Sequence, residues 1–235
     1  MSIFICGDIH GEHDIYKLGS NYFDASDLTK DDYMIICGDF GLIWDYRGET
    51  KEERYWLDWL ENKPWTTLFV DGNHENFDRL NNDYEIEEWN GGKVHRIGNS
   101  IYHLMRGEVF NLQGKLFFCM GGAPSHDIEY RTENKSWWRA EVPSQEERAK
   151  ACETLDKYNW KVDYVITHDA PSDIAEMLLW NIRDYSRGLN EYTNWLQYIA
   201  ENLDFKRWFF GHYHMDRTFD DGKYNAMFYD VKWLM

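Results

Sequence analysis

The stretch IICGDFGLIW, residues 35–44, decides the fold because it joins an apolar run to a carboxylate. The run stops at Gly38 and Asp39. An earlier stretch, FICGDIHG at residues 4–11, repeats the pattern and places Asp8 where the later one has Asp39. Short apolar runs that stop at Gly-Asp are typical of buried parallel strands that end in a loop. We therefore interpret the two stretches as two strands that each deliver one carboxylate to a common site.

Strand and helix patterns alternate in the first third of the chain, which predicts a β-α-β-α-β arrangement. The second predicted helix carries large apolar side chains at helical spacing, which are expected to pack in the core. These side chains are Tyr55, Trp56, Trp59 and Leu60. The predicted strands are residues 2–6, 33–37 and 66–70, and the predicted helices are residues 12–22 and 51–63.

The middle of the chain changes character, since short apolar runs separated by Gly or Asn predict antiparallel strands and a second sheet. These runs are residues 93–98, 100–105, 108–113 and 115–123. Residues 125–143 lack periodicity and predict a long ordered loop of a functional kind. Ser144 and Glu147 then have capping-box spacing, which marks a helix start. The remaining predicted elements are a strand within 162–171, a helical region over 172–202, and strands within 206–214 and 223–231.

Composition limits the classes of function. The chain has 235 residues, which fits one domain over residues 1–235, and its net charge of −17 should repel nucleic acids and anionic membranes. Nucleic acid is therefore an unfavoured partner. No basic segment with an apolar run of signal-peptide length begins the chain, and no apolar stretch approaches the roughly 20 residues that span a bilayer. A cytoplasmic protein that does not enter a membrane is the expectation; the oligomeric state stays open.

Polar side chains gather just after the apolar runs. The loops beyond the carboxyl ends of parallel strands form the ligand crevice of open α/β sheets, so these dispersed residues are expected to converge. On neighbouring strands, Asp8 and Asp39 would place like charges about 5 Å apart. At an effective dielectric near 20 this repulsion costs roughly 3 kcal/mol, which calls for a cation. The converging residues are Asp8, His10, Asp39, Asn73, His74, His168, His212 and His214.

Carboxylate, imidazole and amide oxygen together suit borderline ions such as Mn, Fe or Zn. The sequence also resembles the calcineurin-like metallophosphoesterase superfamily. The resemblance rests on five ordered blocks: GDIHG from Gly7, GDFG from Gly38, GNHE from Gly72, THDAP from Thr167 and GHYH from Gly211. It implies a four-layer α/β/β/α sandwich with two central mixed sheets and a site for two divalent metal ions.

The resemblance also implies a role for each residue of these blocks. One ion would be held by Asp8, His10, Asp39 and His214, and the other by Asp39, Asn73, His168 and His212. Asp39 would then bridge both ions. His74 matches a histidine that contacts phosphate beside Asn73 and protonates the leaving oxygen, which requires a protonated ring.

In such a site a water between the ions is acidified towards hydroxide while both ions polarise phosphoryl oxygens. In-line attack of this hydroxide on phosphorus is the expected step. The substrate is expected to be a small phosphorylated compound or a nucleotide, as a monoester or a diester.

The GDFG block departs from phosphoprotein phosphatases, which continue it as GDxxDR. Leu42 and Ile43 occupy the places of that Asp and Arg, and apolar side chains can neither orient His74 nor grip phosphate. Arg131 is the preferred substitute as a substrate-binding residue, and its loop is expected to wall the substrate cleft. Other substitutes are Asp45, Arg47, Arg79, Arg139 and His126, and Trp137 and Trp138 either stack on substrate or pack onto the core.

Three functions remain open. The leading one is a dinuclear-metal phosphoesterase. A protein serine/threonine phosphatase or a nuclease of the same superfamily is the related alternative, which Leu42, Ile43 and the net charge disfavour. A non-catalytic metal-binding scaffold is the alternative of another class, and the complete ligand set argues against it.

Overall fold

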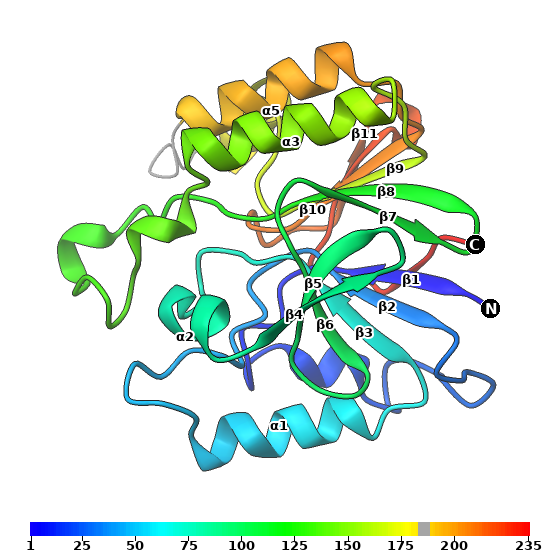
Figure 1. Ribbon diagram of the computed structural model, residues 1–235, viewed down its shortest axis with the longest axis vertical. Helices are drawn as coiled ribbons and strands as arrows, with labels where there is room; N and C mark the ends of the chain where they lie inside the picture. Colours follow the sequence, from blue (N-terminus) through cyan, green and yellow to red (C-terminus); the bar gives the residue numbers. More distant parts are fainter. Residues whose placement is uncertain (183–188) are drawn as a thin grey trace.

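The computed structural model describes residues 1–182 and 189–235, and its strands form two mixed sheets (Figure 1). The seven-stranded sheet has the order β13 (Lys232–Trp233), β1 (Ile3–Cys6), β2 (Tyr33–Ile36), β3 (Thr66–Phe69), β6 (Ile101–Leu104), β5 (Gly92–Arg96) and β4 (Glu85–Trp89). The six-stranded sheet has the order β11 (Arg217–Phe219), β12 (Tyr224–Ala226), β10 (Arg207–Phe210), β9 (Tyr164–Thr167), β8 (Lys115–Met120) and β7 (Glu108–Leu112). Strands β1, β2, β3 and β6 run parallel in the first sheet, and β12, β10, β9 and β8 run parallel in the second. The remaining pairs, β13–β1, β6–β5, β5–β4, β11–β12 and β8–β7, are antiparallel.

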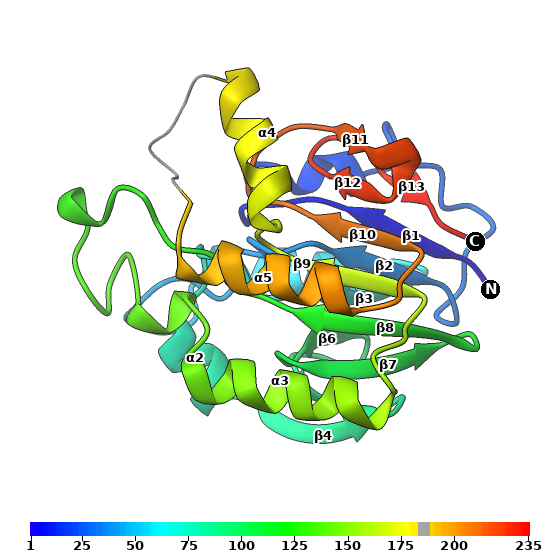
Figure 2. The same cartoon turned by 90° about the horizontal axis from the view of Figure 1, so that it is seen from above.

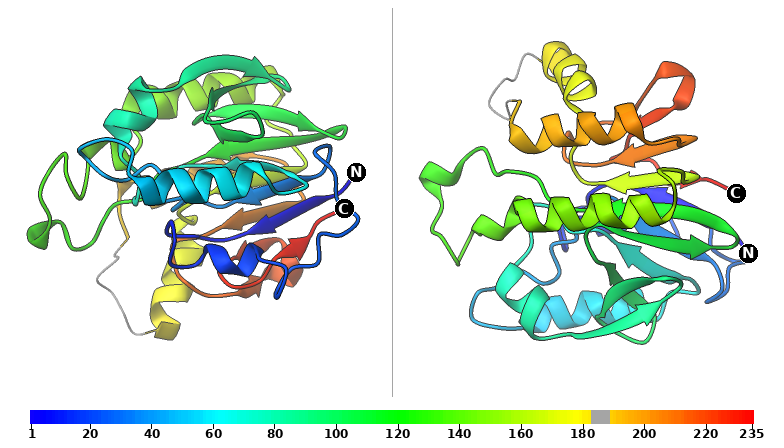
Figure 3. Two further views of the ribbon diagram at one scale, coloured as in Figure 1. Left: turned by 90° about the horizontal axis from the view of Figure 1, so that it is seen from below. Right: turned by 45° about the horizontal axis from the view of Figure 1, so that its top comes forward.

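Helices cover the outer faces of the two sheets. In Figure 1 and the left panel of Figure 3, α1 lies across the seven-stranded sheet, whereas Figure 2 shows α3 and α5 lying over the six-stranded one. No described helix has the length and apolar character needed to cross a membrane. The helices are α1 (Lys51–Glu61), α2 (Phe77–Asn82), α3 (Gln145–Lys157), α4 (Ser172–Ile182) and α5 (Glu191–Asn202).

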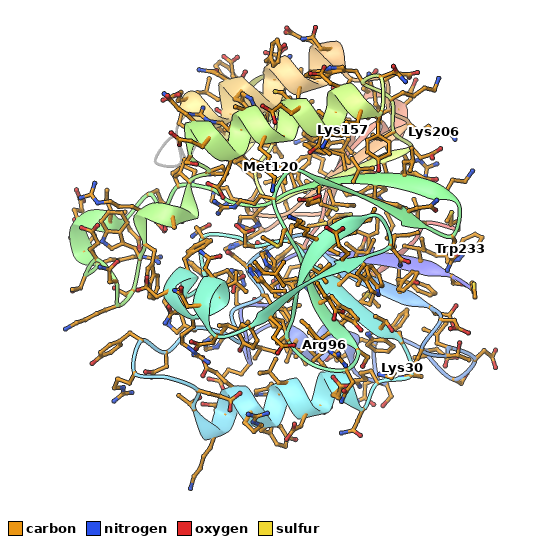
Figure 4. All side chains as sticks on the ribbon, in the orientation of Figure 1. Lys30, Arg96, Met120, Lys157, Lys206 and Trp233 are labelled. Carbon is orange, nitrogen blue, oxygen red and sulfur yellow. The ribbon has the colours of Figure 1, made fainter. Side chains whose placement is uncertain are left out.

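The central core lies between the sheets, where side chains fill the space between the ribbons (Figure 4). Ile5 and Ile35 of the first sheet belong to one buried cluster with Ile166 and Phe209 of the second. Separate apolar clusters join each sheet to its helices. The result is a four-layer α/β/β/α sandwich, as the resemblance implied.

The predicted helix over residues 12–22 is wrong, because only Ile15–Leu18 form a short 3-10 helix. Its polar side chains bond to the neighbouring loops and hold the chain in a turn. Asp14 contacts Nδ1 of His10, and Nζ of Lys17 donates to the backbone carbonyl of Asp8. These tertiary bonds, rather than helix periodicity, set the local conformation.

Helix α1 faces the core with a different stripe from the predicted one. Leu57 and Leu60 are buried, and Trp56 and Trp59 pack partly against the same cluster. Tyr55 is 59% exposed, so its predicted place in the core is wrong. The buried stripe instead includes Glu53, whose carboxylate bonds the backbone N–H of Thr50 and completes the capping box of α1.

Short edge strands escape the sequence analysis. Strands β4, β11 and β13 lie at sheet edges, and none of their residues is buried, so no apolar run marks them in the sequence. The strand predicted over residues 223–231 is too long, since β12 spans only Tyr224–Ala226 and the next strand, β13, begins at Lys232. The helical region predicted over 172–202 contains α4 and α5, and part of it, residues 183–188, lies outside the described residues.

Candidate active site

The predicted site residues converge at the carboxyl ends of five parallel strands. Asp8 and His10 follow β1, Asp39 follows β2, Asn73 and His74 follow β3, His168 follows β9, and His212 and His214 follow β10. Strands β1 to β3 are neighbours in one sheet, and β9 and β10 are neighbours in the other. The site therefore lies at one edge of the sandwich and takes side chains from both sheets.

The first predicted ligand group forms a compact cluster. Asp8, His10, Asp39 and His214 each offer one ligand atom, and these atoms all lie within 4.8 Å of one another. Asp8 and Asp39 are buried, whereas His214 is exposed and His10 is intermediate. Such a cluster is open on one side and is suited to an ion that also contacts a substrate.

The second predicted group surrounds the other oxygen of Asp39. His168 Nε2 lies 3.3 Å from Asp39 Oδ1 and 3.2 Å from Asn73 Oδ1. The rings of His168 and His212 are 5.0 Å apart between centroids. Since His10 Nε2 lies 3.2 Å from Asp39 Oδ2, the two carboxylate oxygens face the two groups separately. This arrangement places Asp39 between them, as a bridging ligand would be.

The donor atoms fit divalent cations. Nε2 of His10 is buried and makes no hydrogen bond of acceptable geometry within the described chain, although Asp39 lies beside it. The set of carboxylates, imidazoles and one amide oxygen matches borderline first-row ions. A buried nitrogen aimed at two carboxylates is a ligand position rather than a packing position.

Opposite charges in the site shift several pKa values. Burial alone would raise the pKa of Asp39, but His168, His74 and His10 hold it well below its usual value. Burial raises the pKa of Asp8 despite His168. Burial opposes protonation of His10 and His168, yet Asp39 raises the pKa of His10 to about 9 and that of His168 to about 10. The site without ions therefore holds protons where cations would lie.

Hydrogen bonds behind the histidines turn Nε2 towards the site. The carboxylate of Asp14 lies 2.8 Å from Nδ1 of His10, and the backbone carbonyl of Cys37 lies 2.8 Å from Nδ1 of His168. Such partners fix ring orientation and tautomer in metal sites. The sequence analysis missed Asp14, because residues 10–14 form turns and the four-residue spacing predicts a contact only on a helix.

Close backbone packing brings the two sheets' loops together. A Cβ on Gly72 would lie 2.1 Å from Asp39 Oδ1, and one on Gly211 would lie 1.9 Å from Asp8 Oδ1. Only glycine leaves room for these carboxylates. The ligand-bearing residues also bend the chain sharply, since His10, Asp39 and His212 have φ values of 42°, 46° and 67°. Positive φ is strained for these side chains, and such strain is typical of functional sites.

His74 borders both the ligand cluster and the long loop of residues 125–143. Its backbone N–H donates to Asp39 Oδ1 at 2.8 Å. Nη2 of Arg131 lies 3.1 Å from His74 Nε2, and Arg131 also pairs with Asp127 at 2.7 Å. A guanidinium only donates, so Nε2 accepts and the ring is neutral in this arrangement. Burial lowers the pKa of His74, which also favours the neutral ring.

The alternative phosphate-binding residues have other partners. Arg79 pairs with buried Glu53 at 2.9 Å, Arg47 pairs with Asp45 at 2.8 Å, and Arg139 pairs with Glu133. His126 is exposed. Trp138 is buried and donates from Nε1 to Asp78 at 2.9 Å, so its role is packing. Among the candidates, Arg131 is the one that contacts a predicted site residue.

The sequence analysis also missed the polar residues that hold the Asn73 loop. Arg106 Nε donates to Asp71 Oδ2 at 2.9 Å, and Arg106 Nη2 donates to the carbonyl of Ala140 at 2.8 Å. Asn73 Nδ2 donates to Ser125 Oγ at 3.3 Å. Ser125 bonds in turn to Glu141, whose pKa burial raises to about 7. No sequence signal joins these groups, because they are more than 10 residues apart along the chain.

Glu75 completes the GNHE block and supports the loop that carries Asp39. Its buried carboxyl accepts hydrogen bonds from the backbone N–H groups of Phe40 at 2.7 Å and Gly41 at 3.2 Å. Burial raises the pKa of Glu75 well above its usual value, and the Asp39 charge adds to this. The block itself pointed to Glu75, although the sequence analysis gave it no role.

A cleft of about 630 Å³ opens beside the ligand cluster and is lined by His10, His74 and His214 among other residues. The loop of residues 125–143 contributes no lining residue to it. The expectation that this loop walls the substrate cleft is therefore wrong for this cleft. The loop projects from the sandwich instead (Figure 2) and reaches the site through Arg131.

Comparisons with known proteins show the family of the chain. The model of the calcineurin-like phosphoesterase family matches residues 1–216, so the chain belongs to that family. No protein with a curated description matches the chain. Among solved structures, the chain is similar to a phosphopantetheinyl hydrolase from Mycobacterium tuberculosis, with 17% sequence identity and a TM-score of 0.48 over 97% of this chain and 89% of that chain.

We predict that divalent ions bind the metal-free protein more tightly as the pH rises from about 6.5 to about 8. His10 and His168 have raised pKa values, so each is protonated at neutral pH and must lose a proton to act as a ligand. Titration calorimetry with Mn²⁺ or Zn²⁺ at several pH values measures this.

Asp14→Asn removes a hydrogen bond that raises the pKa of His10, so it should weaken the pH dependence. An affinity that stays constant over this pH range in the wild-type protein would contradict the assigned ligands.

Proposed function

We propose that the protein is a phosphoesterase that hydrolyses a small phosphorylated compound with the help of two divalent ions, Mn, Fe or Zn. The position of Asp39 carries this proposal. One of its oxygens faces His10 at 3.2 Å and the other faces His168 at 3.3 Å, so a single carboxylate serves both ligand groups. When bound, such ions polarise phosphoryl oxygens and activate water.

The protein residues around the site would bind and orient the substrate. Asn73 and His74 follow β3 and border the candidate ligand cluster, so they can contact a phosphoryl group there. Arg131 lies beside His74 and carries a positive charge. A phosphate oxygen can take the place of His74 Nε2 as the hydrogen-bond acceptor of Arg131. Loss of this contact would free His74 Nε2 to take up a proton. His74 would then act as the general acid for the leaving oxygen.

Two features favour this reading over a protein phosphatase or a nuclease. Leu42 and Ile43 are buried apolar side chains, so this block contributes no carboxylate or guanidinium to phosphate binding. The net charge of −17 opposes a nucleic-acid backbone. A non-catalytic scaffold would have no need for an accessible cleft that is lined by three candidate site histidines.

The direct test is a screen of the protein reconstituted with each metal against p-nitrophenyl phosphate, its bis-ester and a panel of nucleotides. We expect metal-dependent hydrolysis of at least one class. Asp39→Asn should lower kcat/KM by about a hundredfold or more, because it removes a charge from both ligand groups. Asp58→Asn, on the exposed side of α1, is the matched control. Full activity of folded Asp39→Asn protein would exclude the bridging role.

A second prediction concerns His74 as the general acid. His74→Asn should reduce kcat for alkyl phosphates at least about tenfold more than for p-nitrophenyl phosphate, because a poor leaving group needs the proton most. Steady-state kinetics on the two substrates measures this difference. Equal losses on both substrates would remove His74 from this role.

A third prediction concerns Arg131 as the phosphate contact. Arg131→Ala should raise KM about tenfold and change kcat less, because a charge-assisted hydrogen bond to the substrate is lost. Arg139→Ala is the control from the same loop, since Arg139 is exposed and pairs with Glu133. If both variants keep the wild-type KM, Arg131 does not bind phosphate.

A further inference from the structure

The cleft beside the candidate ligand cluster is large enough for more than a phosphate group. Its volume is about 630 Å³, within the range of pockets that enclose small organic molecules. His10, His74 and His214 line one part of it, so it is continuous with the candidate site. A phosphoryl group at that site would leave its ester group facing this cleft.

Apolar side chains form much of the wall. Trp44 lies next to His74, with 5.7 Å between ring centroids, and Phe228 stacks on His214 with a centroid distance of 4.9 Å. Leu42 and Trp56 also line the cleft. Aromatic walls of this kind bind flat apolar groups, and tryptophan faces also attract cations.

Five carboxylates line the same cleft, and three of them already have partners. Asp14 contacts Nδ1 of His10 at 2.8 Å, Asp45 pairs with Arg47, and Glu53 pairs with Arg79. These three contacts hold the side chains of His10, Arg47 and Arg79 in place. They leave Glu12 and Glu52 as the carboxylates that a bound molecule can meet.

Glu12 and Glu52 are exposed and line the same cleft. Both carboxylates place negative charge at its wall. The described lining contains no lysine or arginine to offset this charge. The cleft therefore disfavours anionic groups, such as the further phosphates of a nucleoside polyphosphate, and favours a cation.

We propose that this cleft holds the alcohol part of the phosphoester and selects an aromatic alcohol that carries a cationic substituent. The proposal rests on the phosphoesterase activity proposed above and adds the class of substrate. The aromatic ring lies against Trp44 and Trp56, and the cation lies near Glu12 and Glu52. Arg131 is absent from the cleft lining, so phosphate binding and leaving-group selection use different side chains.

The test uses three phosphate esters whose phenol leaving groups have similar pKa values but different charges. They are tyramine O-phosphate, which is cationic at the side chain, 4-methylphenyl phosphate, which is neutral there, and 3-(4-phosphonooxyphenyl)propanoate, which is anionic there. We expect kcat/KM to fall in this order, with about a tenfold difference between the first and the last at low salt. The difference should shrink at high salt, because exposed charges are screened.

The double variant Glu12→Gln/Glu52→Gln should reduce the cationic-to-anionic ratio of kcat/KM to about one. Glu153→Gln, an exposed position on α3, is the matched control and should keep the wild-type ratio. A wild-type ratio near one, or a ratio that the double variant leaves unchanged, would overturn this inference while the phosphoesterase activity stands. Failure to hydrolyse any ester with any metal would instead overturn the proposed function.

Discussion

Asp39 carries a negative charge at a position that is 1% exposed, and its neighbours are arranged around that charge. A buried carboxylate is costly unless it is paired and hydrogen-bonded. His10 and His168 face its two oxygens, and the backbone N–H of His74 donates to one of them. The loops after β1, β3 and β9 thus converge on the carboxylate that follows β2. The side chains and the backbone N–H that stabilise the buried Asp39 carboxylate therefore form most of the candidate site.

The sequence predicted this convergence because each site residue comes directly after an apolar strand. Parallel strands place their carboxyl ends at one edge, so the position along the chain was enough to bring Asp8 and Asp39 together. The four-layer architecture followed from the family resemblance instead. Arg131 was the preferred substitute among several candidates, because Leu42 and Ile43 cannot bind phosphate and its loop resembles a block found in some members of the family. The structure places Arg131 beside His74.

What the sequence did not predict depends on contacts between distant segments. Arg106 donates hydrogen bonds to Asp71 and to the carbonyl of Ala140. No local sequence pattern around either partner predicts these contacts. The turn after His10 looked helical by spacing, yet Lys17 donates to the backbone carbonyl of the distant Phe228, and this contact overrides that preference. The edge strand β4 was missed for a different reason, because none of its residues is buried and no apolar run marks it.

The candidate ligands come from both halves of the sandwich. Asp8, His10, Asp39 and Asn73 follow strands of the seven-stranded sheet, and His168, His212 and His214 follow strands of the six-stranded one. A pair of ions held by these side chains would be a cross-link between two layers whose shared core is apolar. A chelator that removes the ions would then remove this cross-link between the sheets. Metal binding at this edge would therefore be coupled to the docking of the two sheets, and a chelator would weaken that docking.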